Sequence, residues 1–209
     1  FNRVDLYKYT TLILPNGNYK GILDKQQMKK LESWVEQGGK LVVLGTAISD
    51  FADADAFEIS KYENKEMEKK AKSRRDSIRK VNQLARYDLQ ERYDLSNLVQ
   101  GGVFKTTLDH TNPLGYGYKD HYYTLKNSGR RYPYLKNGYN VSVIEDKSSK
   151  VSGFVGKNVL DSMDDSLVFG IEKKGKGTVV YMVDDPLFRS FWENGKLLFS
   201  NAIFMVGNE

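Results

Sequence analysis

The hydrophobic pattern of the first fifty residues predicts a strand, a helix and a second strand. Residues 6–15, LYKYTTLILP, form an apolar run that ends in a Pro-Asn-Gly turn, which is typical of a buried strand. Residues 25–37 place Met28, Leu31 and Val35 on one helical face, and Asp24 stands where a helix cap is expected. Residues 40–45 are almost wholly apolar, which suits a strand covered on both faces of a parallel sheet. The pattern therefore predicts a right-handed βαβ unit.

The second half of the chain is rich in strand-like runs. Short apolar runs bounded by turn residues predict strands at residues 103–108, 122–125, 141–144, 151–155, 166–172 and 178–183. The last two are joined by the glycine-bearing loop KKGKG, which is a hairpin signal. Residues 196–206 carry a wide apolar helical face that should pack on the sheet. We therefore expect one α/β domain over residues 1–209, with an open sheet and helices on both faces.

A long polar segment separates the two halves. Residues 58–97 contain no glycine or proline and carry only a weak apolar stripe, formed by Ile78, Val81, Leu84 and Ala85. This composition predicts a helical insertion that covers the domain or extends from it. Between residues 61 and 94, 11 basic and 7 acidic residues are interspersed, which is typical of a solvated helix face. Despite the net charge of +5, we therefore expect no nucleic-acid partner.

Composition excludes several kinds of chemistry. The chain has no cysteine, so it can hold no disulfide, thiolate nucleophile or cysteine-ligated metal. No apolar run approaches the roughly 18–20 residues of a membrane span, and the longest covers residues 41–48. The first five residues, FNRVD, resemble no signal peptide and lead directly to the first predicted strand. We therefore interpret the chain as a fragment of a longer protein.

One polar loop follows a predicted strand and is a candidate ligand site. Residues 109–118, DHTNPLGYGY, include Asp109, His110, Asn112 and Tyr116, and open α/β sheets bind ligands at the ends of their strands. The alternative is a tight turn in which Asp and Asn bind their own backbone. Seven tyrosines between residues 116 and 139 could form a sugar, peptide or protein platform, or a half-buried β-surface. His110 and His121 are the only histidines, and no zinc-binding pattern surrounds them.

A second polar loop, DDPLFR, follows the last predicted strand. Asp184 and Asp185 could bind a metal or share a proton, as paired carboxylates do. Alternatively, an aspartate before proline starts a turn and caps the next helical segment. Arg189 is the expected ion-pair partner of these carboxylates.

The stretch KLVVLGTAIS, residues 40–49, is patterned like a strand that delivers a nucleophile. An apolar run ends in glycine and turns through small residues, as at the nucleophile elbow of many α/β enzymes. Ala47 occupies the expected tip of this turn, and alanine has no group that can attack a substrate.

These features together resemble the flavodoxin-like, class I glutamine amidotransferase-like fold. The version at the C-terminus of bacterial zinc carboxypeptidases of the carboxypeptidase A-like family is the most similar. The resemblance rests on four blocks: YTTLILPNGNY, LESWVEQGGKLVVLGTAIS, VFKTTLDHTNPLGYGY and GTVVYMVDDPLFRSFWENGKLLFSNAIF. In the closer family we expect histidine before the proline of the third block, where this chain has Asn112.

The resemblance implies a fold without its reaction. The amidotransferase pattern has cysteine where Ala47 stands, and its His-Pro-Glu motif corresponds here to Asp185-Pro186-Leu187. The nucleophile, base and orienting carboxylate that this mechanism requires are therefore all replaced. We expect no catalytic residue, metal or cofactor in this chain, and the zinc would lie in the missing catalytic domain of the parent.

The resemblance also implies partners and a location. It predicts an accessory domain that supports an upstream peptidase domain of the same polypeptide or positions its peptide or glycan substrate. It further predicts a secreted or periplasmic location. Two alternatives remain open: a small-ligand or carbohydrate-binding module that uses residues 109–123, and a residual hydrolase that uses Asp184, Asp185 or His110.

Overall fold

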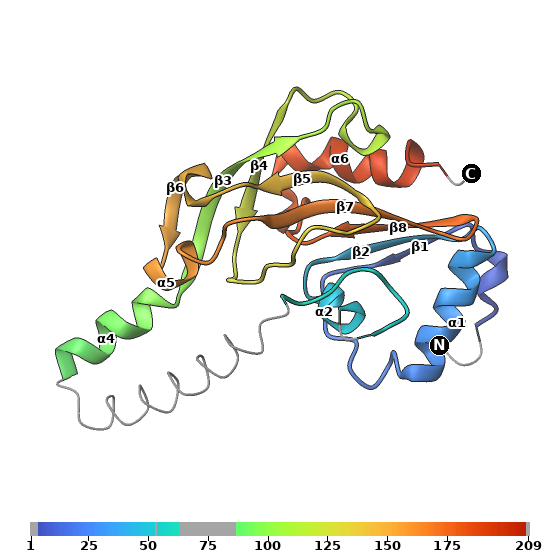
Figure 1. Cartoon of the computed structure of the whole chain (residues 1–209), viewed down its shortest axis with the longest axis horizontal. Helices are drawn as coiled ribbons and strands as arrows, with labels where there is room; N and C mark the ends of the chain where they lie inside the picture. The colour runs from blue at the N-terminus through green and yellow to red at the C-terminus, as the bar shows by residue number, and fades with distance from the viewer. Residues whose placement is uncertain (1–3, 53, 63–86, 208–209) are drawn as a thin grey trace.

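The chain forms one curled, mixed sheet with helices on both faces (Figure 1). The computed structural model describes residues 4–52, 54–62 and 87–207. In these residues the strand order is β1-β2-β8-β7-β5-β3-β4, and β6 pairs with β3 beside this path. The strands are β1 (Thr11–Leu14), β2 (Lys40–Leu44), β3 (Val99–Leu108), β4 (His121–Lys126), β5 (Tyr139–Ile144), β6 (Lys150–Val155), β7 (Ser166–Lys174) and β8 (Gly177–Met182).

The predicted α/β open sheet is confirmed, and its N-terminal part is the expected strand, helix and strand. Helix α1 (Lys25–Glu36) connects β1 to β2, which pair in parallel. The Asp24 carboxylate accepts hydrogen bonds from the N–H groups of Gln26 and Gln27 at 2.8 and 2.9 Å, and so caps the helix. On its other side β2 pairs in parallel with β8, so three parallel strands lie together.

The first predicted strand is wrong over half of its length. Residues 6–8 form a short 3-10 helix, η1 (Leu6–Lys8), and β1 begins only at Thr11. The Asp5 carboxylate accepts a hydrogen bond from the Tyr7 N–H, and the Tyr9 N–H donates to the Leu6 carbonyl. This local capping stabilises a turn where the apolar pattern alone indicates an extended chain.

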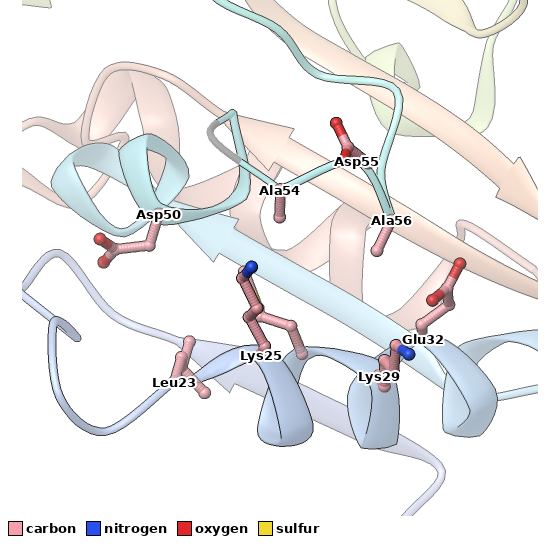
Figure 2. Close-up of a pocket in the computed structure, with 9 residues that line it drawn as sticks. Leu23, Lys25, Lys29, Glu32, Asp50, Ala54, Asp55 and Ala56 are labelled. Carbon is pink, nitrogen blue, oxygen red and sulfur yellow. The ribbon is translucent and has the colours of Figure 1, made fainter.

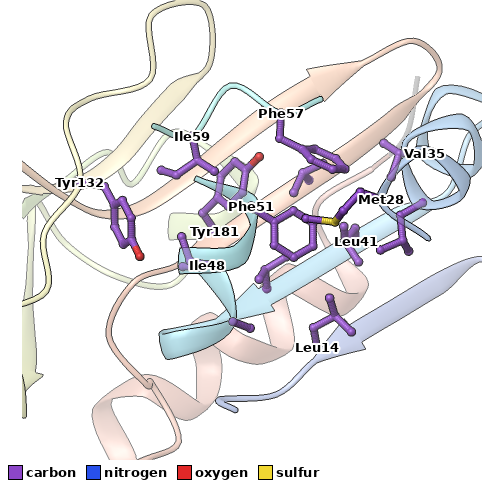
Figure 3. Close-up of a cluster of buried hydrophobic side chains, with 14 of the residues drawn as sticks. Leu14, Met28, Val35, Leu41, Ile48, Phe51, Phe57, Ile59, Tyr132 and Tyr181 are labelled. Carbon is purple, nitrogen blue, oxygen red and sulfur yellow. The ribbon is translucent and has the colours of Figure 1, made fainter. Parts of the chain in front are cut away.

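Strand β2 divides the hydrophobic core into two. All five of its residues are buried, and alternate side chains point to opposite faces. Leu41 and Val43 pack under α1 and the short helix α2 (Ile48–Phe51), in the cluster shown in Figure 3. Val42 and Leu44 pack on the other face, which helix α6 (Glu193–Phe204) covers with Leu198 and Ala202. The covering of both faces explains why β2 carries no alternating polar positions.

The second half of the chain forms the predicted strands and the final helix. The hairpin of β7 and β8 is confirmed, and β5, β3 and β4 continue the sheet as antiparallel neighbours. Helix α6 begins three residues before the predicted position and includes Gly195. A Cβ atom on Gly195 would lie 2.0 Å from the Pro186 carbonyl oxygen, so only glycine permits this close approach. A further short helix, α5 (Lys157–Leu160), follows β6.

Most of the predicted helical insertion at residues 58–97 lies outside the described residues, and so does its weak apolar stripe. Of its ends, residues 58–62 form neither helix nor strand and bury Ile59 in the core, and residues 87–96 form helix α4 (Tyr87–Ser96).

A buried glutamate holds the described start of this segment on the sheet. The Glu172 carboxylate accepts hydrogen bonds from the Tyr181 hydroxyl at 2.5 Å and from the Glu58 N–H at 2.9 Å. Its burial raises the pKa of Glu172 above the ordinary value of a glutamate. The Lys174 ammonium fixes the chain nearby by donating to the Ala56 carbonyl at 2.5 Å. These contacts attach residues 56–58 to β7.

Candidate functional site

The strand-to-helix turn after β2 is sharp, but the residue with a left-handed backbone is Gly45 rather than Ala47. Gly45 has a φ of +56°, which favours glycine, whereas Ala47 has helical angles of −56° and −32°. A Cβ atom on Gly45 would lie 2.6 Å from Oδ1 of Asn16. The Ala47 methyl group is fully buried in the core under α1 and α2. In this turn no side chain is therefore presented at the position of a nucleophile.

Asn16 binds the turn to the end of β1. Its Oδ1 accepts hydrogen bonds from the Thr46 N–H at 2.9 Å and from the Thr46 hydroxyl at 2.5 Å. The Ser49 hydroxyl donates to the Thr46 carbonyl at 2.6 Å and closes the first turn of α2. The Thr46 N–H and the hydroxyls of Thr46 and Ser49 are thus used in local hydrogen bonds and are not open to a substrate.

The loop after β8 lies next to this turn. Leu44 and Met182 are register partners on neighbouring parallel strands, so both chains leave the sheet at the same edge. The turn that begins at Gly45 and the loop that begins at Asp184 therefore follow adjacent strands. Ligands bind at this carboxyl edge in open α/β sheets, and we call it the carboxyl-edge site.

A buried ion pair occupies the carboxyl-edge site. The Asp184 carboxylate contacts Nζ of Lys126 at 3.0 and 3.3 Å, and it accepts a hydrogen bond from the Thr124 hydroxyl at 2.9 Å. The side chains of Lys126 and Asp184 are only 1% and 7% exposed. Ionic groups this deeply buried are held by their mutual attraction and are not free to meet a substrate.

This ion pair also shows that the sheet is curled. Strand β4, which carries Lys126 and Thr124, is separated from β8 by β7, β5 and β3. In a flat sheet four strand spacings amount to about 19 Å, which a lysine cannot span. The rings of Tyr122 and Phe169 confirm the approach, because their centroids lie 5.2 Å apart although β4 and β7 are not neighbours. Curling therefore brings β4 over the end of β8.

Asp185 and Arg189 have separate local roles. The Asp185 carboxylate accepts a hydrogen bond from the Leu187 N–H at 2.9 Å, as an aspartate that starts a turn does. The exposed Arg189 guanidinium lies 5.2 Å from the centre of the Phe188 ring. Among the described residues it forms no ion pair with Asp184 or Asp185, so the expected pairing is wrong. Arg189 and Ser190 both have positive φ angles, of 50° and 60°.

The loop at residues 109–118 is a self-bonded turn. The Asp109 carboxylate accepts hydrogen bonds from the hydroxyl and N–H of Thr111 at 2.6 and 3.0 Å, and the hydroxyl is the main cause of the lowered pKa of Asp109. Asn112 accepts from the Leu114 N–H at 3.0 Å. The amide of Asn201 on α6 donates to the carbonyls of Leu114 and Tyr116 at 3.0 and 2.7 Å. The polar groups of the loop therefore stabilise its own shape.

The two predicted loops nevertheless meet at one end of α6. The Tyr118 hydroxyl donates to the Asn194 carbonyl at 2.7 Å and accepts from the Leu198 N–H at 2.9 Å. Trp192 and Asn194 both donate to the Tyr123 carbonyl, at 3.2 and 3.1 Å. The structure thus joins the 109–118 loop, β4 and the chain that follows Arg189.

The tyrosine cluster divides between the core and the surface. Tyr122 and Tyr132 are buried and Tyr118 is half-buried, as a β-surface requires. Tyr116, Tyr123 and Tyr139 are 45%, 38% and 54% exposed and keep the platform interpretation open.

The histidines lie at the surface. His110 is exposed, and Nδ1 of His121 lies 2.8 Å from the Asp120 carboxylate. Within the part of the chain that the structure describes, no three His, Asp or Glu side chains are grouped as a metal site.

Lys126, Thr124 and Asn16 are residues of the carboxyl-edge site that the sequence pattern did not single out. Lys126 lies one residue beyond the predicted strand 122–125, in register with the buried positions 122 and 124. A lysine at an inward position of a strand needs a buried hydrogen-bond acceptor or a counter-charge. The alternation of buried positions along β4 could have indicated that Lys126 has a buried partner. It could not have identified Asp184 as that partner.

Comparison with solved structures supports the fold. The chain is similar to the cytoplasmic protein STM3548 from Salmonella typhimurium, with a TM-score of 0.55 and 10% sequence identity over 98% of this chain and 74% of the other. It is also similar to the cytoplasmic protein STM1381 from Salmonella typhimurium LT2, with a TM-score of 0.52 and 10% identity over 96% and 73% of the two chains. No protein-family model and no curated protein matches the sequence.

These structures correct one expectation. Both similar proteins are named as cytoplasmic, which contradicts the secreted or periplasmic location that the family resemblance implied. Across the described ranges, no helix combines the length and the apolar character that a membrane crossing requires.

Replacing Lys126 with alanine should lower the free energy of unfolding by about 3–5 kcal/mol, because it leaves Asp184 buried without its cation. Chemical denaturation measures this change. The double variant Lys126→Met with Asp184→Leu should recover most of the loss, since apolar side chains need no buried partner. As the control, Lys147→Ala removes an exposed ion pair with Asp161 and should have no measurable effect. Equal losses for Lys126→Ala and Lys147→Ala would show that the buried pair is unimportant.

Proposed function

We propose that this chain is a non-catalytic, amidotransferase-like accessory domain of a larger protein. One observation carries the proposal: the carboxyl-edge site has the strand-to-helix turn of an elbow, yet it presents no reactive group. Gly45 makes the turn, the Ala47 methyl group is buried, and Asn16 fills the space next to the turn. A nucleophilic mechanism needs an accessible nucleophile with a base within hydrogen-bond reach.

The neighbouring polar groups support the same proposal. The Asp184 carboxylate binds the Lys126 ammonium and the Thr124 hydroxyl. The Asp185 carboxylate accepts a hydrogen bond from the Leu187 N–H. Asp109 binds Thr111, and His110 lies in the same exposed turn. The carboxylates that a residual hydrolase would use therefore already serve the fold.

The family resemblance suggests which larger protein contains this domain. We propose a zinc carboxypeptidase whose metal is held by an upstream peptidase domain of the same polypeptide. In that protein the present domain would support the peptidase domain or position its substrate. The rigid, hydrogen-bonded edge described above suits a supporting role, because its loops are fixed before any partner binds.

Incubation with glutamine and with simple peptides tests the lack of catalysis. The purified chain should release no ammonia from glutamine and no amino acids from peptides above the level of a buffer blank, because the turn after β2 presents no nucleophile. An ammonia assay and a ninhydrin assay measure the two products. Hydrolysis that persists on repurification of the folded chain would overturn the proposal.

A carbohydrate- or small-ligand-binding module is the second candidate function. Tyr116 favours it, because its backbone carbonyl is fixed by Asn201 and the residue is 45% exposed. A fixed, exposed aromatic ring is a common contact for sugar faces and peptides.

A glycan array followed by thermal-shift measurements tests this second function. A glycan that binds through the loop should lose roughly five- to tenfold in affinity on Tyr116→Ala, because the stacking contact that is removed contributes about 1–1.5 kcal/mol. Tyr139→Ala is the matched control, because it removes an equally exposed tyrosine from β5. Binding that both variants reduce alike, or no binding at all, would exclude the loop as the site.

A further inference from the structure

Strand β1 is an edge of the sheet (Figure 1), and two of its residues direct their backbone groups away from the neighbouring strand. The Lys40 N–H of β2 donates to the Thr10 carbonyl at 3.0 Å. Because successive residues of a parallel strand direct their N–H and C=O groups to opposite edges, Leu12 faces β2, and Thr11 and Ile13 face outward. Among the described residues, no strand other than β2 pairs with β1, and these outward groups have no hydrogen-bond partner. The edge is therefore able to accept another strand.

The segments before and after β1 are held on one face of the sheet. Before the strand, the Val4 carbonyl accepts a hydrogen bond from the Lys30 ammonium of α1 at 2.6 Å. After the strand, the Tyr19 N–H donates to the Asp50 carboxylate of α2 at 3.2 Å, and Leu23 lines a pocket beside α1 and α2 (Figure 2). Hydrogen bonds thus direct both segments to the face that α1 and α2 cover, rather than along the edge of β1.

The other outer strands, β4 and β6, are protected against pairing with another chain. The Tyr123 carbonyl of β4 accepts hydrogen bonds from the side chains of Trp192 and Asn194 at 3.2 and 3.1 Å. The pairing of β6 with β3 shifts register twice, and Gly153 has a φ of +78°. Bulges, charges and prolines are features that keep an edge from pairing with a further strand. Residues Thr11–Leu14 contain no charge or proline, and their pairing with β2 is regular.

Strand β1 is complementary to itself. In an antiparallel pair centred on Leu12 of both copies, Thr11 of one copy lies opposite Ile13 of the other, and both residues exchange their N–H and C=O bonds. The two-fold axis repeats this pair, so every outward group of both edges is satisfied. Because Leu14 is buried on the α1 side, the side chains of Thr11 and Ile13 point to the opposite face. There they would meet as uncharged cross-strand neighbours and cover Ile13, which is 38% exposed.

We infer that two copies of this chain associate through β1 and form one continuous sheet. Such an interface closes at the dimer, because the same residues act in both copies. Strand β1 has only four residues, so the dimer is weak and reversible. A strand of another protein would have to match this register, whereas a second copy matches it by its own sequence. The inference does not depend on the proposed accessory role, since neither Thr11 nor Ile13 belongs to the carboxyl-edge site.

Analytical ultracentrifugation of the purified chain tests the association. Between about 5 and 500 µM the chain should pass from mostly monomer to mostly dimer, with a dissociation constant of about 100 µM or below. Ile13→Lys should raise this constant roughly tenfold or more, because it places like charges in the paired edge. Val151→Lys is the matched control, because it puts the same charge on an exposed valine of β6, and it should dimerise like the unchanged protein.

Amide hydrogen exchange, measured by NMR, locates the contact without any substitution. The N–H groups of Thr11 and Ile13 are unpaired in the monomer and would be hydrogen-bonded in the dimer. They should therefore exchange roughly threefold or more slowly at about 500 µM than at about 20 µM protein. Leu12 is the internal control, because its N–H faces β2 in either state and its exchange should not depend on dimer formation.

Two results would overturn the inference. One is a monomer at every concentration up to about 1 mM. The other is a dimer that Ile13→Lys leaves unchanged, or in which the amides of Thr11 and Ile13 exchange as fast as in the monomer, because the contact would then lie elsewhere. Catalytic assays of the carboxyl-edge site do not bear on either result, so this inference and the proposed function fail separately.

Discussion

The burial of β2 on both faces is the constraint on which the rest of this structure depends. A strand with five buried residues must have hydrogen-bonded neighbours on both edges and apolar cover on both faces. Its parallel partners β1 and β8 supply the edges. Helices α1 and α2 cover one face, and α6 covers the other. The same arrangement directs the chain ends of β1, β2 and β8 to a single edge.

At that edge the protein uses its polar groups for structure. Asn16 connects the ends of β1 and β2, and the contact between Lys126 and Asp184 connects β4 to the end of β8. The second contact requires the sheet to curl, and the curl in turn buries both charged groups. An edge that binds ligands in many α/β proteins is here filled by side chains of the domain itself. A pocket of about 590 Å³ lies beside α1 and α2, next to the elbow rather than within it.

Local patterns predicted most of the fold, and long-range contacts account for what they missed. The helix at α1 followed from its cap and its apolar spacing, and the β7–β8 hairpin followed from its glycine loop. The turn at residues 6–8 was missed because Asp5 caps it locally, and an apolar pattern does not register a cap. The pairing of Lys126 with Asp184 joins residues 58 positions apart across a curled sheet, so no window of sequence contains it. The expected ion pair of Arg189 with Asp184 or Asp185 was wrong because residues that are near in sequence need not have side chains that point toward each other. Arg189 lies over the Phe188 ring instead.

The accessibility of the elbow tip tests the central claim most directly. Because the chain has no cysteine, Ala47→Cys introduces a single thiol whose reaction with a disulfide reagent can be followed alone. We predict that this thiol reacts in the native state only as fast as the protein opens, since the Ala47 side chain is fully buried. The thiol of Ser33→Cys, on the exposed side of α1, should react at once and serves as the control. Immediate reaction at position 47 in a variant of unchanged stability would contradict the account, because it would show that the elbow is open to substrates.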